Sequence, residues 1–321
     1  MGDPAGIGPE VIVRGFQEAA AAGGITVIGD AEVLQQACDS CGIAMEVREV
    51  DTPHPVRDPA HLPVIQVDDV QDHQWGEIDA AYGRASLAYI DYAADLAENG
   101  VVDAMVTAPI HKQAVRQAGS EHPGHTGRLA ARSGTDQYTM LLVEGALRVS
   151  HVSTHVSLRS AIDLITADRI CDTIRLTANG ISNLGISDPR IAVAGLNPHA
   201  SDGGLLGSEE TDCIAPAVQT AAADGIDVIG PEPPDTVFGR ALSGECDGVV
   251  AMYHDQGHIP VKLLGVARDG EVSGVNVTLG LPIIRTSVDH GTAFDIAGQG
   301  IASPRSFIQA VELAADLATT A

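Results

Sequence analysis

The segment "RIAVAGLNPHASDGGLLGSEETDCIAPAVQTAAADG", residues 190–225, contains one complete strand–loop–helix unit. Its first residues form a short apolar run that is typical of a buried strand, and its second half has the apolar spacing of a helix. A glycine-rich polar loop that carries His199 lies between the two. Strands and helices that alternate in this way build parallel α/β sheets.

The same alternation continues along most of the chain, and it predicts an α/β protein with a largely parallel sheet in each of two lobes. The strand-like runs are "GITVIGD", "PVIQV", "DAMVTAP", "YTMLLV", "LRVSHVST", "RIAVAGLNP", "DGVVAMYH" and "GVNVTLGLP". The helical patterns between them include "RASLAYIDYAADLAENG", "ADRICDTIRLTANGISNLG" and "SEETDCIAPAVQTAAADG".

The chain has 321 residues, which is too long for one ordinary hydrophobic core. We therefore expect two lobes. The first is predicted to comprise residues 1–115 and 287–321, because the chain passes back to it at the C-terminus. The second is predicted to comprise residues 116–286.

The composition excludes several classes of partner. The net charge is −25, so the surface repels nucleic acid and anionic membranes. No uncharged stretch approaches the ~18–20 residues that a membrane span needs. We therefore expect a cytoplasmic protein. The only two lysines, Lys112 and Lys262, both lie in dense polar motifs.

The opening "MGDPAGIGPE" has the composition of a turn that enters a helix. No strand-like run precedes it, although the βα pattern of the rest of the chain requires one. We expect a short first strand upstream of it.

Three histidines follow three separate predicted strands. His155 follows "LRVSHVST", His199 follows "RIAVAGLNP" and His254 follows "DGVVAMY". Ligands of α/β folds gather beyond the carboxyl ends of strands, so these imidazoles can converge on a divalent metal ion. A histidine at a strand end is also commonly a structural hydrogen-bonding residue, and spacing alone leaves both interpretations open.

A second set of residues suits an anionic ligand. The turn "GHT" offers His125, Thr126 and backbone N–H groups, while Lys262, Asn276 and Arg285 add an ammonium, an amide and a guanidinium. Together they suit a phosphate. The alternative is that the cations form salt bridges with neighbouring carboxylates.

Several motifs then occur in order: "GDPAGIGPE", "TAPIHK", "GHT", "STHVSLR", "GLNPHASDGGLLGSEE", "GPEPPDTVF", "MYHDQGHIPVK" and "GVNVTLGLPIIRTSVDHGTAFDIAGQG". From residue 2 to about residue 305 the chain resembles the 4-hydroxythreonine-4-phosphate dehydrogenase family of pyridoxine and pyridoxal-phosphate biosynthesis. Its segment "HGTAFDIAGQGIASP" is also similar to the adenine-side loop of isocitrate and isopropylmalate dehydrogenases, which bind NAD(P) without a Rossmann fingerprint.

The resemblance implies two α/β/α lobes with an active-site cleft between them, and a homodimer in which Asp235 reaches into the partner's site. It implies one divalent ion (zinc, cobalt, magnesium or manganese) and either NAD or NADP. The implied metal ligands are His155, His199 and His254. The implied substrate contacts are His125, Thr126, Asp235, Lys262, Asn276 and Arg285, and the implied cofactor contacts are His290, Gly291, Thr292, Ala293 and Asp295.

The implied reaction is oxidation of the C3 hydroxyl of a 4-phosphorylated four-carbon acid. The metal lowers the pKa of that hydroxyl, hydride passes to the nicotinamide, and the β-keto acid loses CO₂. His254 and Lys262 are the expected catalytic residues. The general base is either Lys262 or a metal-bound water.

Two features depart from the family pattern. Gly127 stands where the family commonly has an acid, and the segment from Lys262 to Asn276 is longer than in the pyridoxine enzymes. Both favour a sister branch of threonate catabolism that acts on 4-phospho-D-threonate or 4-phospho-D-erythronate. The alternative functions are a metal-dependent lyase or phosphatase acting on a small phosphorylated acid, and a dehydrogenase of another vicinal-diol acid.

Overall fold

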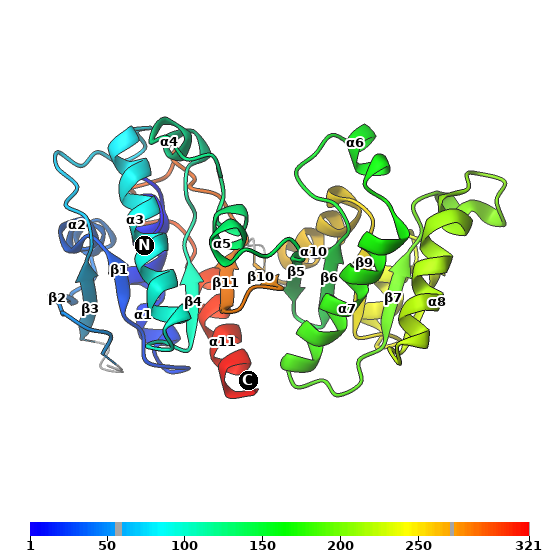
Figure 1. Cartoon of the computed structure of the whole chain (residues 1–321). Helices are drawn as coiled ribbons and strands as arrows, with labels where there is room; N and C mark the ends of the chain where they lie inside the picture. The colour runs from blue at the N-terminus through cyan, green and yellow to red at the C-terminus, as the bar shows by residue number, and fades with distance from the viewer. Residues whose placement is uncertain (55–59, 270–272, 321) are drawn as a thin grey trace. The chain divides into compact units, whose positions relative to one another are not determined.

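The computed structural model describes residues 1–54, 60–269 and 273–320. The chain divides into two compact units (Figure 1). The first unit comprises Met1–Thr135 and Leu281–Thr319, and the second is formed mainly by Asp136–Gly280. Both units contain sheets and helices, so the predicted α/β class is confirmed.

The first unit contains two parallel pairings of strands. Strands β1 (Val27–Gly29), β3 (His61–Gln66) and β2 (Glu46–Glu49) form a parallel sheet in the order β1-β3-β2, and β4 (Ala104–Thr107) pairs in parallel with β11 (Ile284–Val288). The helices are α1 (Gly8–Ala19), α2 (Ala31–Cys41), α3 (Ala80–Glu98), α4 (Lys112–Gln117), α5 (His125–Ser133) and α11 (Arg305–Thr320).

The second unit has a mixed sheet. Its strands lie in the order β10 (Val275–Leu279), β5 (Thr139–Glu144), β6 (Leu147–His151), β9 (Gly248–Ala251), β7 (Ile191–Ala194) and β8 (Val228–Glu232). The pairs β10–β5 and β5–β6 are antiparallel, and the remaining pairs are parallel. All residues of β7 and β9 are buried, as expected for parallel strands that are covered on both faces.

Helices complete the second unit. They are α6 (Leu158–Asp163), α7 (Ala167–Asn183), a 3₁₀ turn (Pro198–Asp202), a π-helical turn (Glu210–Ile214), α8 (Ala215–Ala223), α9 (Val237–Leu242) and α10 (His254–Asp269). In the part of the chain that the structure describes, no helix is long and apolar enough to cross a membrane.

Capping side chains mark where several helices begin. Asp30 accepts a hydrogen bond from the Val33 N–H at 2.9 Å at the start of α2, and Thr166 accepts one from the Arg169 N–H at 3.3 Å at the start of α7. Such caps satisfy backbone donors that the first turn leaves without a partner. Gly42 ends α2 with a φ of 65°, which glycine adopts readily.

The eight predicted strands are all present, but β2, β8 and β11 were not predicted. Strand β2 has the sequence EVRE, is mostly exposed and shows no apolar run, and β8 contains a Gly-Pro pair. Helix α10 was also missed, because Gly257 and Pro260 disfavour a helix. The first part of the long segment from Lys262 to Asn276, up to Asp269, belongs to α10; residues 270–272 lie outside the described residues.

The predicted lobe boundaries after residues 115 and 286 are also corrected, to positions after Thr135 and Gly280. Helix α5 belongs to the first unit because the Arg128 Nε donates a hydrogen bond to Asp91 of α3 at 2.8 Å. Strand β11 belongs there because it pairs with β4.

Gly83 sets how closely α3 approaches the segment around Ala114. A Cβ at Gly83 would lie 2.2 Å from the Ala114 carbonyl oxygen. Helix propensity alone would favour Gly83→Ala by about 1 kcal/mol, but the clash is with backbone and overpacking costs about 1–3 kcal/mol or more. We therefore expect Gly83→Ala to lower the free energy of unfolding, measured by urea denaturation.

Gly239 of α9 provides the matched control. A Cβ there would meet no atom within 4 Å, so Gly239→Ala should raise the free energy of unfolding by up to about 1 kcal/mol. Equal effects of the two substitutions would show that close packing at Gly83 does not limit stability.

Candidate active site

Three adjacent strands of the second unit end at the same edge of its sheet. Strand β9 pairs in parallel with β6 on one side and with β7 on the other. His155, His254 and His199 follow β6, β9 and β7, respectively. The predicted metal ligands therefore all leave the sheet at the carboxyl edge, where ligands of α/β folds bind.

Two of these imidazoles lie together. The ring centroids of His155 and His254 are 5.5 Å apart. Both side chains line a pocket of about 270 Å³, which also includes Ser153, Thr154 and Tyr253. This pocket is the part of the predicted metal site that the structure assembles.

The imidazole of His254 is oriented by its neighbour. Its Nδ1 lies 2.7 Å from the Asp255 carboxylate, so Nδ1 carries the proton and donates it to this hydrogen bond. The lone pair of Nε2 then faces away from Asp255 and can bind a metal ion. A carboxylate partner on the second ring nitrogen is common for metal-binding histidines.

His199 lies in a strained loop. The φ angles of His199, Ala200, Ser201 and Asp202 are between 47° and 64°, in the left-handed region that L-residues rarely occupy. The His155 φ is 49°. Strained backbone of this kind clusters at functional sites.

The predicted three-histidine set is not assembled around one point. Among the residues that the structure describes, no three His, Cys, Asp or Glu side chains are grouped so that they could hold a metal ion. His155 and His254 are close to each other, whereas His199 is exposed.

A buried carboxylate holds the His199 loop. Glu210 is 2 % exposed, and its Oε1 accepts hydrogen bonds from the N–H groups of Leu196 and Asn197 at 2.8 and 2.7 Å. Its Oε2 accepts a third, from the Asn197 side chain, at 2.9 Å. Sequence reasoning missed this role; the paired acids that end "GLLGSEE" were the available signal.

Two further histidines adjoin the pair, and sequence reasoning gave neither a role. The His258 ring stacks on that of His254 with centroids 3.6 Å apart, and the His258 Nδ1 donates to the His254 carbonyl at 2.9 Å. His151 is 1 % exposed, and its ring centroid is 4.7 Å from that of His258. The imidazole cluster therefore extends from the pocket into the core.

His151 and Gly257 fit each other closely. Neither ring nitrogen of His151 has a hydrogen-bond partner at normal geometry. The backbone of Met140 lies near the ring. Burial lowers the pKa of His151 to about 3, so the ring is neutral. A Cβ at Gly257 would lie 2.3 Å from the His151 Nε2, which explains a glycine inside α10.

The first unit brings together two of the predicted phosphate contacts. Arg285 is 3 % exposed, and its Nε and Nη2 donate to the Thr107 hydroxyl at 3.1 and 2.7 Å. Burial lowers the Arg285 pKa to about 10, which leaves the side chain charged at neutral pH. Burial, and then the Arg285 charge, hold the His125 pKa well below its ordinary value.

The other predicted substrate contacts lie elsewhere. Thr126 follows His125 in the first turn of α5, while the half-buried Lys262 lies in α10 of the second unit. Asn276 lies in β10, where its amide nitrogen contacts the Met140 sulfur. Asp235 is exposed in the turn before α9. The predicted set is thus divided between the two units.

The predicted cofactor loop follows β11 and packs on the "GDPAGIGPE" loop. The Ile7 N–H donates to the Thr292 carbonyl at 3.0 Å, and a Cβ at Gly6 would lie 3.0 Å from the Thr292 Cβ. The His111 ring stacks on Phe294 with centroids 4.7 Å apart. The loop that carries His290, Gly291, Thr292, Ala293 and Asp295 is therefore fixed against the start of the chain.

Asp3 is a buried carboxylate in this corner that sequence reasoning missed. It is 0 % exposed, and its Oδ1 accepts a hydrogen bond from the Ala5 N–H at 3.0 Å. Burial raises the Asp3 pKa to about 6, and this backbone bond opposes the shift.

Comparisons with known proteins agree with one another. The family model of "Pyridoxal phosphate biosynthetic protein PdxA" matches residues 22–314. The chain is 46% identical over 324 residues to a Desulfosudis oleivorans protein named "4-hydroxythreonine-4-phosphate dehydrogenase", covering 99% of this chain and 94% of that one. It is 44% identical over 324 residues to a Cupriavidus necator protein named "D-threonate 4-phosphate dehydrogenase", covering 99% and 96%.

A solved structure agrees with these relatives. The crystal structure of 4-hydroxythreonine-4-phosphate dehydrogenase from Klebsiella pneumoniae aligns with a TM-score of 0.88 and 44% identity, covering 99% of this chain and 96% of that one. The fold is the α/β fold of this dehydrogenase. The chain belongs to the PdxA family.

The burial of Asp3 has a pH-dependent consequence. Its folded-state pKa of about 6 lies above the ordinary 3.8, so the protonated carboxyl is favoured in the folded state. The resulting stability is fully present below pH 3.8 and is lost as the pH rises through 6. The difference between these two pKa values corresponds to a loss of at most about 3 kcal/mol in the free energy of unfolding.

Between pH 4 and pH 7, we expect the free energy of unfolding to fall less for the Asp3→Asn variant than for the unchanged protein. Urea denaturation at each pH measures this difference. The exposed Asp51→Asn is the control and should follow the unchanged protein. If the curves of Asp3→Asn and Asp51→Asn run parallel, Asp3 does not carry the buried proton.

Proposed function

We propose that this protein is an NAD(P)- and divalent-metal-dependent dehydrogenase acting on a 4-phosphorylated four-carbon hydroxy acid. In the proposed reaction, the C3 hydroxyl is oxidised and the resulting β-keto acid loses CO₂. The observation that carries the proposal is the His155–His254 pair at the carboxyl edge of β6 and β9, with His254 oriented by Asp255. The names of the relatives support the choice of substrate class.

The chemistry of the donors suits a divalent ion, although among the described residues only His155 and His254 lie together. His155 and His254 would bind it, and His199, which follows the neighbouring strand β7, would be the third ligand. Neutral imidazoles suit zinc or cobalt, while magnesium or manganese would rely more on substrate oxygens. When bound, such an ion supplies Lewis-acid character that lowers the pKa of a substrate hydroxyl.

The protein's own residues provide orientation and charge. Asp255 fixes the tautomer of His254, and Glu210 holds the backbone that carries His199. Arg285 keeps its charge in a buried position beside His125, where a phosphate would find both a cation and a ring N–H. Lys262 is proposed to contact the substrate anion and to act as the general base.

The cofactor is proposed to bind at the loop after β11. His290, Gly291, Thr292, Ala293 and Asp295 would contact NAD or NADP, and the packing of Thr292 against Gly6 would keep this loop in place. We further propose a cytoplasmic homodimer, with the exposed Asp235 reaching into the partner's site.

Gly127 supports the threonate branch as the substrate class. A Cβ at Gly127 would meet only the His122 side chain, at 3.6 Å or more, and the Gly127 φ is not positive. Neither packing nor backbone conformation requires glycine there. A substrate without an amino group needs no carboxylate partner at this position of α5, and the glycine fits that case.

The function is tested by a panel of 4-phospho acids offered with NAD and with NADP, following reduction of the cofactor. We expect higher kcat/KM with 4-phospho-D-threonate or 4-phospho-D-erythronate than with 4-phosphohydroxy-L-threonine. The preference is expected because an ammonium placed where the site offers no carboxylate partner loses its hydration without compensation. Gly127→Glu should shift the preference toward the amino acid.

No cofactor reduction with any of these acids would refute the dehydrogenase proposal. Release of inorganic phosphate without reduction would instead favour the phosphatase alternative. A clear preference for the amino acid would reject the threonate branch and retain the dehydrogenase.

The metal site is tested by His254→Ala and His199→Ala, with metal content per chain measured after dialysis. Both variants should lose most of the bound divalent metal and cofactor-reducing activity while their circular dichroism is unchanged. His61→Ala, in β3 of the first unit, is the control and should keep both. Metal content unchanged in His254→Ala would reject the site.

A further inference from the structure

Two polar side chains of α1 contact the end of the loop after β11, the loop that is proposed to bind NAD or NADP. Glu10 and Arg14 are four residues apart, so they project from the same side of the helix. The Glu10 Oε1 accepts a hydrogen bond from the Gly298 N–H, and the Arg14 Nη1 donates one to the Gly300 carbonyl. An acid and a base of α1 therefore hold the two ends of the segment 298–300.

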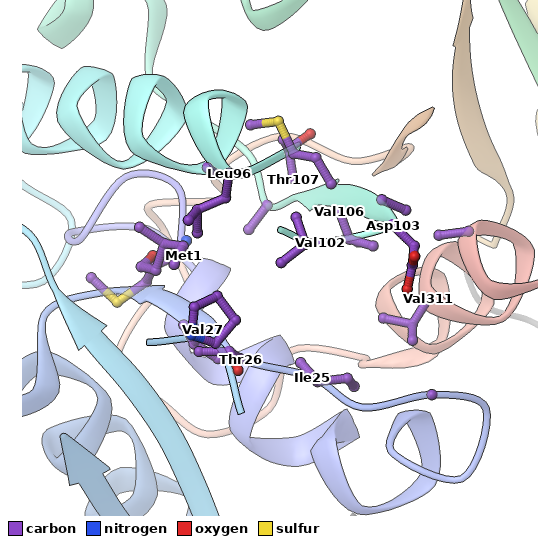
Figure 2. Close-up of a pocket in the computed structure, with 18 of the residues that line it drawn as sticks. Met1, Ile25, Thr26, Val27, Leu96, Val102, Asp103, Val106, Thr107 and Val311 are labelled. Atoms are coloured by element: carbon purple, nitrogen blue, oxygen red, sulfur yellow. The ribbon is translucent and has the colours of Figure 1, made fainter. Parts of the chain in front are cut away.

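The other side of α1 is apolar. Two residues of a helix correspond to a rotation of about 200°, so Ile12 points away from Glu10. Ile12 lines a cavity of about 410 Å³ whose wall includes Ile25, Val27 and Val106 (Figure 2). Helix α1 thus directs its apolar side to this cavity and its polar pair to the loop.

Burial couples the Glu10 carboxylate to the position of the loop. Glu10 is 0 % exposed, and among the described residues its Oε2 has no hydrogen-bond partner. A buried carboxylate is strongly unfavourable unless donors compensate for its lost hydration. If the loop moved away, the Gly298 N–H would be lost as a donor, so the carboxylate favours the conformation in which the loop lies on α1.

Two glycines allow the loop to approach its neighbours closely. Gly298 and Gly300 have φ angles of 79° and 68°, which glycine adopts readily. A Cβ at Gly298 would lie 2.5 Å from the Trp75 Cδ1, and a Cβ at Gly300 would lie 2.6 Å from the Ser40 carbonyl oxygen of α2. The end of the loop is therefore enclosed by α1, by α2 and by Trp75.

Hydrogen bonds within the loop connect this end to the expected cofactor contacts. The Gln299 Nε2 donates to the Asp295 carbonyl at 2.8 Å, and the Ile296 N–H donates to the Ala293 carbonyl at 3.1 Å. A displacement of Gly298 is thereby transmitted to Asp295 and Ala293.

We propose that Glu10 and Arg14 are positioning residues for the dinucleotide, an inference that rests on the proposed cofactor site. They keep the loop after β11 in the conformation that binds NAD or NADP, and they act through the backbone of Gly298 and Gly300. The apparent cofactor affinity is then the intrinsic affinity multiplied by the fraction of molecules in which the loop is held.

The first test compares two variants of similar side-chain size, Glu10→Gln and Glu10→Met. Glutamine keeps a carbonyl oxygen that accepts from the Gly298 N–H, whereas methionine fills the same space without an acceptor. Amide hydrogen exchange at Gly298 should be at least about tenfold faster in Glu10→Met than in Glu10→Gln, because a charge-assisted hydrogen bond is lost.

The second test measures cofactor binding without turnover. Trp75 is the only tryptophan of the chain and packs on Gly298, so energy transfer from Trp75 to bound NADH or NADPH reports the Kd. Glu10→Met should raise this Kd by about tenfold, and Glu10→Gln by less than about twofold. The KM for the phosphorylated acid should stay the same in both variants, which a general loss of structure would not allow.

The exposed Arg14 gives a variant that does not disturb the core. Arg14→Met should raise the Kd of the reduced cofactor by about three- to tenfold, because the Gly300 carbonyl loses its donor. Arg48→Met, an equally exposed arginine of β2, is the matched control and should leave the Kd unchanged. If Glu10→Met does not fold, the comparison of Arg14→Met with Arg48→Met decides the proposal.

Equal exchange rates or equal Kd values in Glu10→Met and Glu10→Gln would overturn the positioning role. Faster exchange with an unchanged Kd would also overturn it, because holding the loop would then not serve the cofactor. If the unchanged protein binds neither NADH nor NADPH, the proposed cofactor site fails and the positioning role fails with it. A failure of the positioning role alone is distinguishable, because the unchanged protein then still binds the dinucleotide.

Discussion

Parallel pairing of β9 with both β6 and β7 is the constraint on which the candidate site depends. Parallel strands end at one edge, and neighbouring strands lie only about 4.8 Å apart. His155 and His199 are more than forty positions apart in the sequence, yet both follow strands that end at the same edge of the sheet. All residues of β7 and β9 are buried, as expected where both faces of the sheet are covered.

Much of the fold could be predicted because apolar runs report burial directly. The runs at 190–198 and 247–254 became β7 and β9, and "ADRICDTIRLTANGISNLG" became α7. The elements that the sequence did not predict, such as β2 and α10, share a common cause. Strand β2 is exposed and charged, and α10 contains Gly257 and Pro260, so tertiary contacts rather than local preference decide both elements.

The candidate site was predictable in its residue types and strand ends, but not in its supporting contacts. The position of His254 after β9 follows from the pattern, whereas its stacking on His258 and the burial of His151 depend on the angle at which α10 leaves the sheet. Arg285 was expected among phosphate ligands, and nothing in the sequence indicated that Thr107 would hold its guanidinium. Hydrogen-bond partners distant in the chain leave no periodic signal.

The loop after β7 shows where the information for a local shape can reside. His199, Ala200 and Ser201 adopt a backbone that none of them prefers, and Glu210 supplies the hydrogen bonds that hold the preceding turn. The shape of this loop is therefore encoded largely outside the loop itself. Substitution of its exposed residues should be tolerated structurally, whereas position 210 should accept almost no replacement, since even aspartate is one methylene too short to reach the same N–H groups. The position of this segment that tolerates substitution least would thus be the buried Glu210, not the exposed residues of the loop.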